Sequence, residues 1–379
     1  MSIQSCEIIQ DGKAVSVAFT DAGAVRFHAI WLRDNSFDPQ TRSPDNGQKL
    51  ISVGDLPEHP TIASASHSGE ELEIRLAGNS EPMCFSASWL SDHAYDRGPR
   101  SEIGWLPNDI EAWTAENLPS VPQARFDDLQ TNTEALQGWL AMVRAYGFAK
   151  ITHGPTEPQS LLKVANLFGY VRETNYGRWF EVRSEINPTN LAYTGLGLQA
   201  HTDNPYRDPV PTLQILYCLE NSAQGGDSMV VDGFAAASRL RDESPDHFEL
   251  LSSHCARFEY AGSEGVKLQS RRPMIEVAPD GELIAVRFNN RSTAAIQDVP
   301  FEKMEAYYEA WRRFADIIDD PKMEISFKLE PGECFIVDNT RVLHARKGYS
   351  GSGTRWLQGC YVDKDGLLST LAALENKAA

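Results

Sequence analysis

The sequence lacks long hydrophobic runs, paired cysteines and an excess of positive charge. No stretch approaches the ~18 uncharged apolar residues that suggest a membrane-spanning helix, so we expect no membrane span. The cysteines are scattered and include no CxxC or similar pair: Cys6, Cys84, Cys218, Cys255, Cys334 and Cys360. This spacing argues against a disulfide framework or a cysteine-rich zinc site, and it favours a reducing compartment.

The start of the chain and its net charge restrict the function classes further. The first residues, MSIQSCEIIQDGKAV, contain no apolar segment of a secretion signal, so we expect a cytoplasmic protein. The formal net charge is −18. Because an acidic surface repels nucleic acid and anionic membranes, we expect neither as a partner. The same charge could attract a cationic substrate, although solubility is the simpler interpretation.

The first part of the chain has a strand-like pattern. Residues 1–100 contain short alternating runs, AVSVAF, AVRFHAIWL, ELEIRLA and MCFSASWL, with turn residues between them. This pattern predicts a small β-rich N-terminal domain. A polar stretch with prolines then predicts a linker near 95–125, and we expect a second domain over 120–379. We identify no internal repeat.

The second domain combines helical and strand-like patterns. Residues 132–147, 157–169 and 300–319 have apolar positions at helical spacing. Many short apolar runs surround them, among them PTLQILYCL, SMVVDGF, CFIVDN, RVLHARK and RWLQGCYVD. Strands this numerous favour a sandwich or barrel over a parallel sheet. The expected fold class is therefore mainly β with flanking helices.

Three residues are candidates for an iron site. His201 and Asp203, two positions apart, fall on the same side of an extended chain, and His344 follows an apolar strand and a polar turn. Two histidines and a carboxylate hold Fe(II) and leave positions open for a co-substrate and O₂. His-x-Asp alone is a weak signal, because nine histidines make a chance match common. Arg355 could grip the far carboxylate of an iron-bound 2-oxo acid.

The ordered set of His-x-Asp, GGDS (225–228), DNTRVLHAR and TRW is far more specific. It resembles the Fe(II)/2-oxoglutarate-dependent oxygenases of the γ-butyrobetaine hydroxylase group, within the taurine-dioxygenase-like superfamily. The resemblance covers nearly the whole chain, including FHAIWLRDNS and SASWLSDHAYD. It implies a double-stranded β-helix (jelly-roll) core, and family habit suggests a homodimer. It also implies His201, Asp203 and His344 as iron ligands, and Arg355 with Ser228 as the binding site for 2-oxoglutarate.

The N-terminal domain departs from this family at a structural zinc site. Members often carry three cysteines after WLRDN and a histidine further on. Here Ser36, Asp38 and Thr41 stand at the cysteine positions and Glu81 near the histidine position. Because these side chains cannot form a thiolate-rich zinc site, we expect no zinc.

The substrates of the family carry a trimethylammonium group. Such a group has no N–H donor, so aromatic faces select it. The resemblance places Tyr176, Phe180, Tyr193 and Tyr361 around it, with Trp179 as an alternative to Phe180. Without the resemblance, packing of these aromatic side chains in the core would be the simpler interpretation.

The other end of the substrate is anionic. Asn190 and Asn289 match amide positions that resemble the carboxylate-binding pair of the family. Arg291 lies two residues after Asn289, so both side chains point the same way if the strand continues. Alternatively, Arg291 lies at a strand end and faces solvent. An added guanidinium would suit a more highly charged group such as a phosphonate.

Arg291 and the missing zinc ligands favour one variant of the family, a hydroxylase of 2-(trimethylammonio)ethylphosphonate. A γ-butyrobetaine hydroxylase that makes carnitine is the main alternative. A trimethyllysine hydroxylase and a non-catalytic barrel that binds quaternary ammonium ligands are further alternatives. The intact iron and 2-oxo acid residues argue against the last of these.

Overall fold

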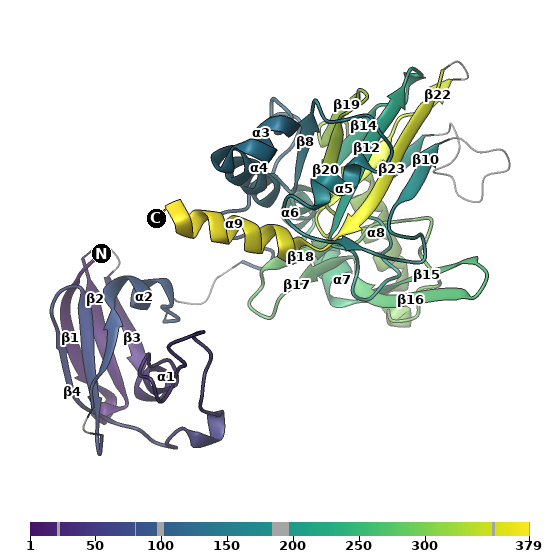
Figure 1. Ribbon diagram of the computed structural model, residues 1–379. Helices are drawn as coiled ribbons and strands as arrows, with labels where there is room; N and C mark the ends of the chain where they lie inside the picture. Colours follow the sequence, from purple (N-terminus) through teal and green to yellow (C-terminus); the bar gives the residue numbers. More distant parts are fainter. Residues whose placement is uncertain (21–22, 80, 97–101, 184–196, 351–352, 379) are drawn as a thin grey trace. The chain divides into compact units, whose positions relative to one another are not determined.

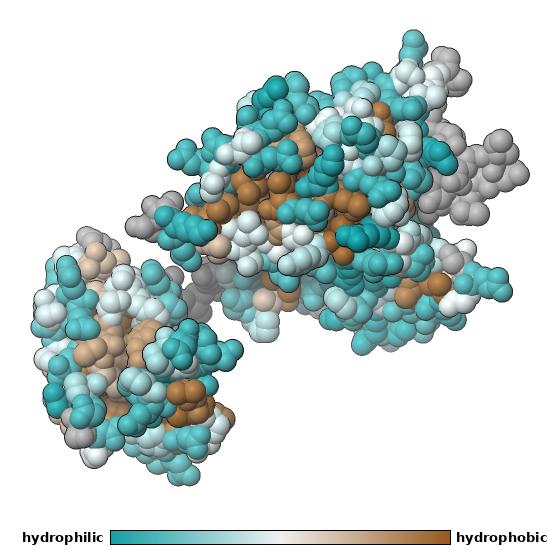
Figure 2. Space-filling view, viewed as in Figure 1, coloured by the Kyte–Doolittle hydropathy of each residue, from teal (hydrophilic) through white to brown (hydrophobic). Residues whose placement is uncertain are grey.

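The chain divides into two units, Met1–Pro99 and Arg100–Ala379, in the computed structural model (Figure 1). The structure describes residues 1–20, 23–79, 81–96, 102–183, 197–350 and 353–378. Within these ranges, no helix is long and apolar enough to cross a membrane. Figure 2 shows hydrophobic side chains gathered on the visible face of the larger unit, amid a mostly hydrophilic surface.

Two three-stranded antiparallel sheets form the N-terminal unit, and a short helix follows each sheet. The first group is β1 (Ile3–Ile9), β2 (Ala14–Phe19), β3 (Gly23–His28) and α1 (Ala29–Asp34). The second group is β4 (Ile62–His67), β5 (Glu71–Leu76), β6 (Met83–Ser86) and α2 (Ala87–Asp92). Their buried faces share one hydrophobic core, as a β-rich domain requires.

These two groups carry a repeated motif, so the prediction of no internal repeat was wrong. Phe-x-Ala-x-Trp-Leu-x-Asp occurs at 27–34 and again at 85–92. Each copy crosses from a strand into a helix, whereas the sequence patterns suggested strands throughout. The hydroxyl of Ser86 accepts a hydrogen bond of 3.2 Å from the backbone N–H of Trp89 and starts the second helix. The rings of Trp31 and Trp89 lie 5.3 Å apart, so the copies meet in the core.

Hydrogen bonds join three of the residues that stand where members of the family often carry zinc ligands. Asp38 accepts from the hydroxyl of Thr41 at 2.7 Å and from its backbone N–H at 3.0 Å. Arg33 donates to the same hydroxyl at 2.6 Å, and the hydroxyl of Ser36 accepts from the backbone of Asp38 at 3.4 Å. Glu81 is exposed. Protein partners therefore satisfy this cluster, and the absence of zinc stays a prediction.

Two larger sheets dominate the second unit. The first has the order β10–β23–β12–β20–β8–β7, with β9 paired to β23, and the second has the order β11–β21–β14–β19. The strands of the first are β7 (Gln123–Arg125), β8 (Phe148–Thr152), β9 (Val171–Arg172), β10 (Phe180–Arg183), β12 (Leu213–Asn221), β20 (Cys334–Asp338) and β23 (Arg355–Val362). Those of the second are β11 (Leu198–His201), β14 (Ser228–Asp232), β19 (Glu324–Phe327) and β21 (Val342–Arg346).

Three two-stranded sheets complete the strands of this unit within the ranges that the structure describes. They are β13 (Gln224–Gly225) with β22 (Tyr349–Ser350), β15 (Cys255–Ser263) with β16 (Val266–Pro273), and β17 (Ile275–Val277) with β18 (Leu283–Val286). Neighbouring strands come from distant parts of the chain, as in a jelly roll. The predicted fold class, mainly β with a jelly-roll core and a small β-rich N-terminal domain, is confirmed.

The two large sheets face each other across a shared core, and helices cover their outer faces. Phe148, Cys218 and Phe335 from the larger sheet meet Val230 and Val342 from the smaller one. The outer face of the larger sheet packs on α3 (Phe126–Thr131), α4 (Thr133–Tyr146), α5 (Ser160–Ala165) and α9 (Lys364–Ala378). The smaller sheet packs on α6 (Gly233–Glu243), α7 (Pro245–Ser253) and α8 (Met304–Ile318). This sandwich leaves one end of the space between the sheets for a ligand.

Candidate active site

A pocket of about 530 Å³ opens between the two large sheets, within the size range of small-molecule sites. Alternation along the strands decides which side chains reach it. On β12, Gln214 and Leu216 line the pocket, whereas Ile215 packs toward the helices. On β23, Arg355 and Tyr361 line it. The pocket is therefore built by the inward face of both strands.

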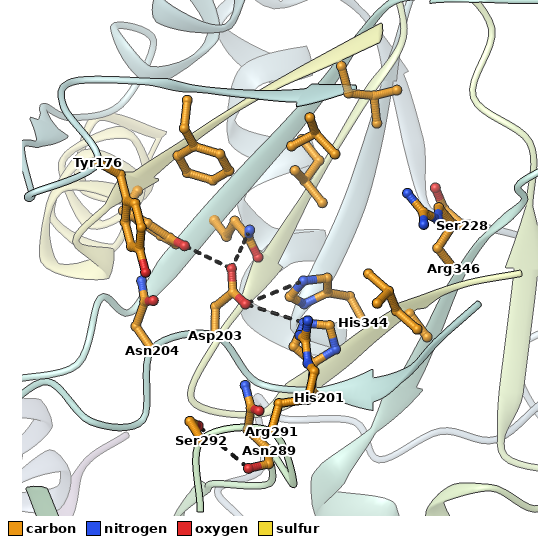
Figure 3. Close-up of a pocket in the computed structure, with 18 of the residues that line it drawn as sticks. Tyr176, His201, Asp203, Asn204, Ser228, Asn289, Arg291, Ser292, His344 and Arg346 are labelled. Carbon is orange, nitrogen blue, oxygen red and sulfur yellow. Dashed lines mark hydrogen bonds and ion pairs between the residues drawn. The ribbon is translucent and has the colours of Figure 1, made fainter. Parts of the chain in front are cut away.

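Two histidines and one aspartate converge in this pocket, as Figure 3 shows. His201 ends β11, and His344 lies directly opposite it on β21. Nε2 of His201 lies 3.3 Å from Oδ1 of Asp203, and Nε2 of His344 lies 4.0 Å from the same oxygen. One ligand atom from each residue lies within 4.8 Å of the others. In the part of the chain that the structure describes, no other group of three such residues does so.

Hydrogen bonds orient two of the three candidate ligands. Nδ1 of His201 donates to the carbonyl oxygen of Gln199 at 2.7 Å, which leaves Nε2 as the ligand atom. Oδ2 of Asp203 accepts from the amide of Gln214 at 2.7 Å and from the hydroxyl of Tyr361 at 2.8 Å. Only Oδ1 of Asp203 therefore faces the two imidazoles.

Asn339 fixes the backbone of Asp203. It lies in the turn between β20 and β21, and its side chain accepts from the N–H of Asp203 at 2.6 Å. The same amide donates to the carbonyl oxygens of Asp203 at 2.9 Å and Pro211 at 2.8 Å. The turn that leads to His344 thus also holds the backbone of Asp203, which ties the two sides of the site together.

The surroundings set the protonation states that a metal needs. Burial opposes ionisation of Asp203, yet its close neighbours, first His201 and also His344 and Tyr361, hold the pKa of this carboxyl well below its ordinary value. Burial, with a smaller contribution from His201, lowers the pKa of His344 to about 3. An ionised carboxylate and a neutral imidazole are the forms that bind metal ions.

This donor set fits Fe(II). Two imidazoles and one carboxylate on one face of a β-barrel are the ligands of non-haem Fe(II) oxygenases. Two ligand atoms at right angles on an ion about 2.1 Å away lie about 3 Å apart. The 3.3 Å between Nε2 of His201 and Oδ1 of Asp203 is close to that spacing, whereas the 4.0 Å between Nε2 of His344 and the same oxygen is wider. The sequence-based prediction that these residues meet His344 is confirmed by the geometry.

Aromatic side chains form one wall of the pocket, which we call the aromatic wall: Tyr176, Phe180, Tyr206, Tyr260 and Tyr361. Ring centroids lie 5.8 Å apart for Tyr176 and Tyr260, 5.2 Å for Tyr206 and Tyr260, and 5.3 Å for Phe180 and Tyr361. The hydroxyls of Tyr176 and Tyr206 lie 2.8 Å apart and share a hydrogen bond. Such a set of ring faces can hold an organic cation.

Polar groups occupy another part of the pocket. β18 ends at Val286, so the strand does not continue through Asn289 and Arg291, yet both residues line the pocket. The amide nitrogen of Asn289 donates to the carbonyl oxygen of Thr202 at 3.0 Å. Its buried Oδ1 has no partner among the described residues. Asn289 therefore offers a ligand an acceptor, and Arg291 offers donors.

Ser228 and Arg355 also line the pocket, as predicted for a 2-oxoglutarate site. Both are buried, with 3% and 8% of their surfaces exposed. The structure adds a second guanidinium that the sequence analysis missed, Arg346, which lies beside Ser228 in Figure 3. Arg346 follows His344 by two positions on β21, and this alternation was the available signal.

The remaining predicted substrate residues divide into two groups. Asn190 and Tyr193 lie outside the described residues. Trp179 is absent from the described pocket lining and packs against the core beneath the helices. Phe180, the next residue, lines the pocket instead, because successive side chains of an extended chain point to opposite faces.

Several pocket residues had no sequence-based prediction: Asn204, Tyr206, Gln214, Glu259, Tyr260, Ser292 and Arg346. Gln214 had a local signal, because it is an amide directly flanked by the apolar Leu213 and Ile215 in PTLQILYCL. A polar group in a buried strand usually has a specific partner. Tyr260 had no local signal in the sequence, since β15 and β16 reach the pocket only through the tertiary fold.

Comparison with known proteins gives two family matches. Residues 106–361 match a family described as Taurine catabolism dioxygenase TauD, TfdA family, and residues 6–91 match one described as Gamma-butyrobetaine hydroxylase-like, N-terminal. Gamma-butyrobetaine dioxygenase of Pseudomonas sp. (strain AK-1) is 33% identical over 362 residues, which are 95% of this chain and 94% of that protein. Trimethyllysine dioxygenase of Meyerozyma guilliermondii is 30% identical over an alignment of 378 residues, gaps included, which covers 96% of this chain and 94% of that protein.

A solved structure supports the fold independently. The crystal structure of asparagine oxygenase is similar with a TM-score of 0.50 and 16% sequence identity. The likeness covers 64% of this chain and 93% of that chain. At this identity it bears on the fold alone.

Proposed function

Because the chain belongs to the TauD, TfdA family of Fe(II)- and 2-oxoglutarate-dependent dioxygenases, we propose that it hydroxylates a small trimethylammonium compound with an anionic end. The observation that carries the proposal is one pocket with three parts: the His201, Asp203 and His344 site, the aromatic wall, and the polar groups of Asn289 and Arg291. A molecule with a cation at one end and an anion at the other matches these parts.

The cofactor and co-substrates supply the chemistry, and the chain supplies the positions. With Fe(II), 2-oxoglutarate and O₂, the reaction gives succinate, CO₂ and a hydroxylated substrate. His201, Asp203 and His344 would hold the metal, and Arg355 with Ser228 would hold the distal carboxylate of 2-oxoglutarate by charge-assisted hydrogen bonds. The aromatic wall and Arg291 would hold the two substrate ends so that one C–H faces the metal.

We further propose 2-(trimethylammonio)ethylphosphonate as the favoured substrate. A guanidinium suits a carboxylate and a phosphonate alike, but a phosphonate has three oxygens to share between Arg291 and its neighbours, whereas a carboxylate has two. The acceptor Oδ1 of Asn289 suits a donor, and a singly protonated phosphonate carries an O–H as well as acceptor oxygens, whereas a carboxylate has acceptors only. Both features support a phosphonate over a carboxylate.

Two relatives favour other substrates. The Pseudomonas relative is named for γ-butyrobetaine and covers nearly the whole chain, so γ-butyrobetaine is the second candidate. Trimethyllysine is the third, since it names the Meyerozyma relative. A barrel that binds a quaternary ammonium ligand without catalysis would need no iron ligands, so the triad argues against it.

The test is O₂ uptake with Fe(II), 2-oxoglutarate and each of the three compounds. We expect the phosphonate to stimulate uptake most. Arg291→Ala should raise KM for the phosphonate about tenfold more than KM for γ-butyrobetaine, because a hydrogen bond between charged groups is worth about 1.5–3 kcal/mol. Arg291→Lys is the matched control that keeps the charge. Equal effects on both substrates would refute the role of Arg291, and no stimulation by any compound would refute the proposed reaction.

A further inference from the structure

The two oxygens of the Asp203 carboxylate have separate surroundings. Oδ1 lies 3.3 Å from Nε2 of His201 and 4.0 Å from Nε2 of His344. Oδ2 accepts two hydrogen bonds, from Gln214 at 2.7 Å and Tyr361 at 2.8 Å. The ligand that the chain offers to a metal is therefore one oxygen, with the other engaged by protein donors.

The two donors are neighbours in the larger sheet. Gln214 on β12 and Tyr361 on β23 are directly paired across the antiparallel ladder, so their side chains lie side by side on one face. Both are buried, with 2% and 4% of their surfaces exposed. Asp203, by contrast, follows β11 of the smaller sheet. The donors thus reach the carboxylate from the opposite layer of the sandwich.

The chemistry of both donors fixes the direction of these bonds. A phenol hydroxyl that faces a carboxylate donates to it. The amide of Gln214 must present its nitrogen, because an amide oxygen would repel the carboxylate. If both oxygens of Asp203 bound the ion, two charge-assisted hydrogen bonds would have to break or lengthen.

One-oxygen binding matters for the number of open positions. Two imidazoles and one carboxylate oxygen leave about three of the roughly six positions of the ion open. A 2-oxo acid that binds through two oxygens and an O₂ molecule together need three. A second oxygen from Asp203 would remove one of these positions.

We infer that Gln214 and Tyr361 are positioning residues that hold Asp203 as a one-oxygen ligand. Tyr361 also presents its ring to the aromatic wall, where it lies 5.3 Å from Phe180. The hydroxyl and the ring of Tyr361 therefore have different tasks: the hydroxyl holds the metal ligand, and the ring contributes to the substrate wall. Only the second task rests on the proposed function.

Removal of the hydroxyl alone tests the inference. Tyr361→Phe keeps the ring, and Gln214→Leu removes the other donor. We expect each change to raise the dissociation constant for Co(II), a substitute for Fe(II) that is stable in air, about tenfold, because loss of a group that hydrogen-bonds a metal ligand weakens metal binding by about this factor or more. Calorimetric titration of the metal-free full-length chain measures it. In steady-state turnover, we also expect more succinate per hydroxylated product in Tyr361→Phe.

Tyr206→Phe is the matched control, because it removes a pocket hydroxyl that contacts Asn204 and Tyr176 but not Asp203. Its Co(II) affinity should stay within about twofold of the wild type. A Tyr361→Phe protein that folds and also binds Co(II) within about twofold of the wild type would overturn the inference. If Gln214→Leu does not fold, Tyr361→Phe decides alone. The titration contains no substrate, so failure of the proposed function would leave its result unchanged.

Discussion

Arg346 and Arg355 bring two guanidinium groups into one pocket, although one is enough for the distal carboxylate of 2-oxoglutarate. Both are buried, and both line the pocket. Arg355 begins β23 in the larger sheet, whereas Arg346 ends β21 beside Ser228 in the smaller sheet. The sequence resemblance favours Arg355, and position alone does not separate the two.

Substitution at the residue scale separates them. We expect Arg355→Gln to raise KM for 2-oxoglutarate at least about tenfold, since loss of a charge-assisted hydrogen bond costs about 1.5–3 kcal/mol. Arg346→Gln should raise it less. Initial rates at saturating substrate and varied 2-oxoglutarate measure both. A larger effect from Arg346→Gln would assign the carboxylate to Arg346 instead.

The convergence of His201, Asp203 and His344 was predictable because their pattern is partly local. His201 and Asp203 are two positions apart, and His344 is in a recognisable motif. The groups that orient them were not predictable in the same way. Gln214 and Tyr361 meet only because β12 pairs with β23. The alternation of apolar and polar residues within one strand does not indicate which distant strand becomes its neighbour.

At the scale of elements, β23 determines the shape of the pocket through alternation. Arg355, Leu357, Gly359 and Tyr361 occupy alternate positions of the strand, and Gly359 is paired with Phe180 on β10. A Cβ at position 359 would overlap the ring of Phe180. The glycine therefore gives Phe180 the space that it needs in the aromatic wall.

Gly359→Ala tests this contact. We expect the ring of Phe180 to move and KM for the trimethylammonium substrate to rise several-fold to tenfold, in keeping with the roughly 0.5–2 kcal/mol of a cation–π contact. Co(II) affinity should stay within about twofold of the wild type, because the added methyl group would meet Phe180 and Leu216 first. Steady-state kinetics and a Co(II) titration measure the two effects. A loss of Co(II) affinity with an unchanged KM would contradict the interpretation.

Element types were predictable where capping or alternation is strong. The helix predicted at 132–147 appears as α4, because Asn132 accepts from the N–H groups of Glu134 and Ala135 and Gly147 adopts φ +72°. The junctions at 27–34 and 85–92 were not predictable from alternation. Their apolar residues suit either a strand or the buried face of a short helix. Packing in the tertiary core therefore decides where the strand ends and the helix begins.

At the scale of the whole molecule, the family resemblance implied the jelly-roll class, which the fold confirms. The predicted domains at 1–100 and 120–379 stay a prediction, and the family matches lie at 6–91 and 106–361. The order of strands within the sheets is a tertiary property that the sequence analysis did not provide. The expected homodimer stays a prediction that sedimentation of the full-length chain can test.

The site also makes the stability of the metal-free protein depend on pH. Burial, and then His201, lower the pKa of His344 to about 3, whereas an unfolded histidine has a pKa of about 6.5. Below pH ~6.5 the unfolded chain binds a proton that the folded chain does not, so stability falls as the pH decreases toward 3. The lowered pKa of Asp203 acts in the same direction below pH ~4, where unfolded carboxyls bind protons.

We therefore expect the free energy of unfolding to fall by up to about 1.4 kcal/mol per pH unit below pH ~6.5 on account of His344. Urea unfolding at several pH values with a chelator present measures the slope, since a bound ion would itself favour the neutral imidazole. His344→Gln removes the titrating group but keeps a polar side chain, so its slope over the same interval should be smaller. An equal slope in the variant would show that the folded protein does not keep His344 neutral, and that burial at the metal site is weaker than its contacts indicate.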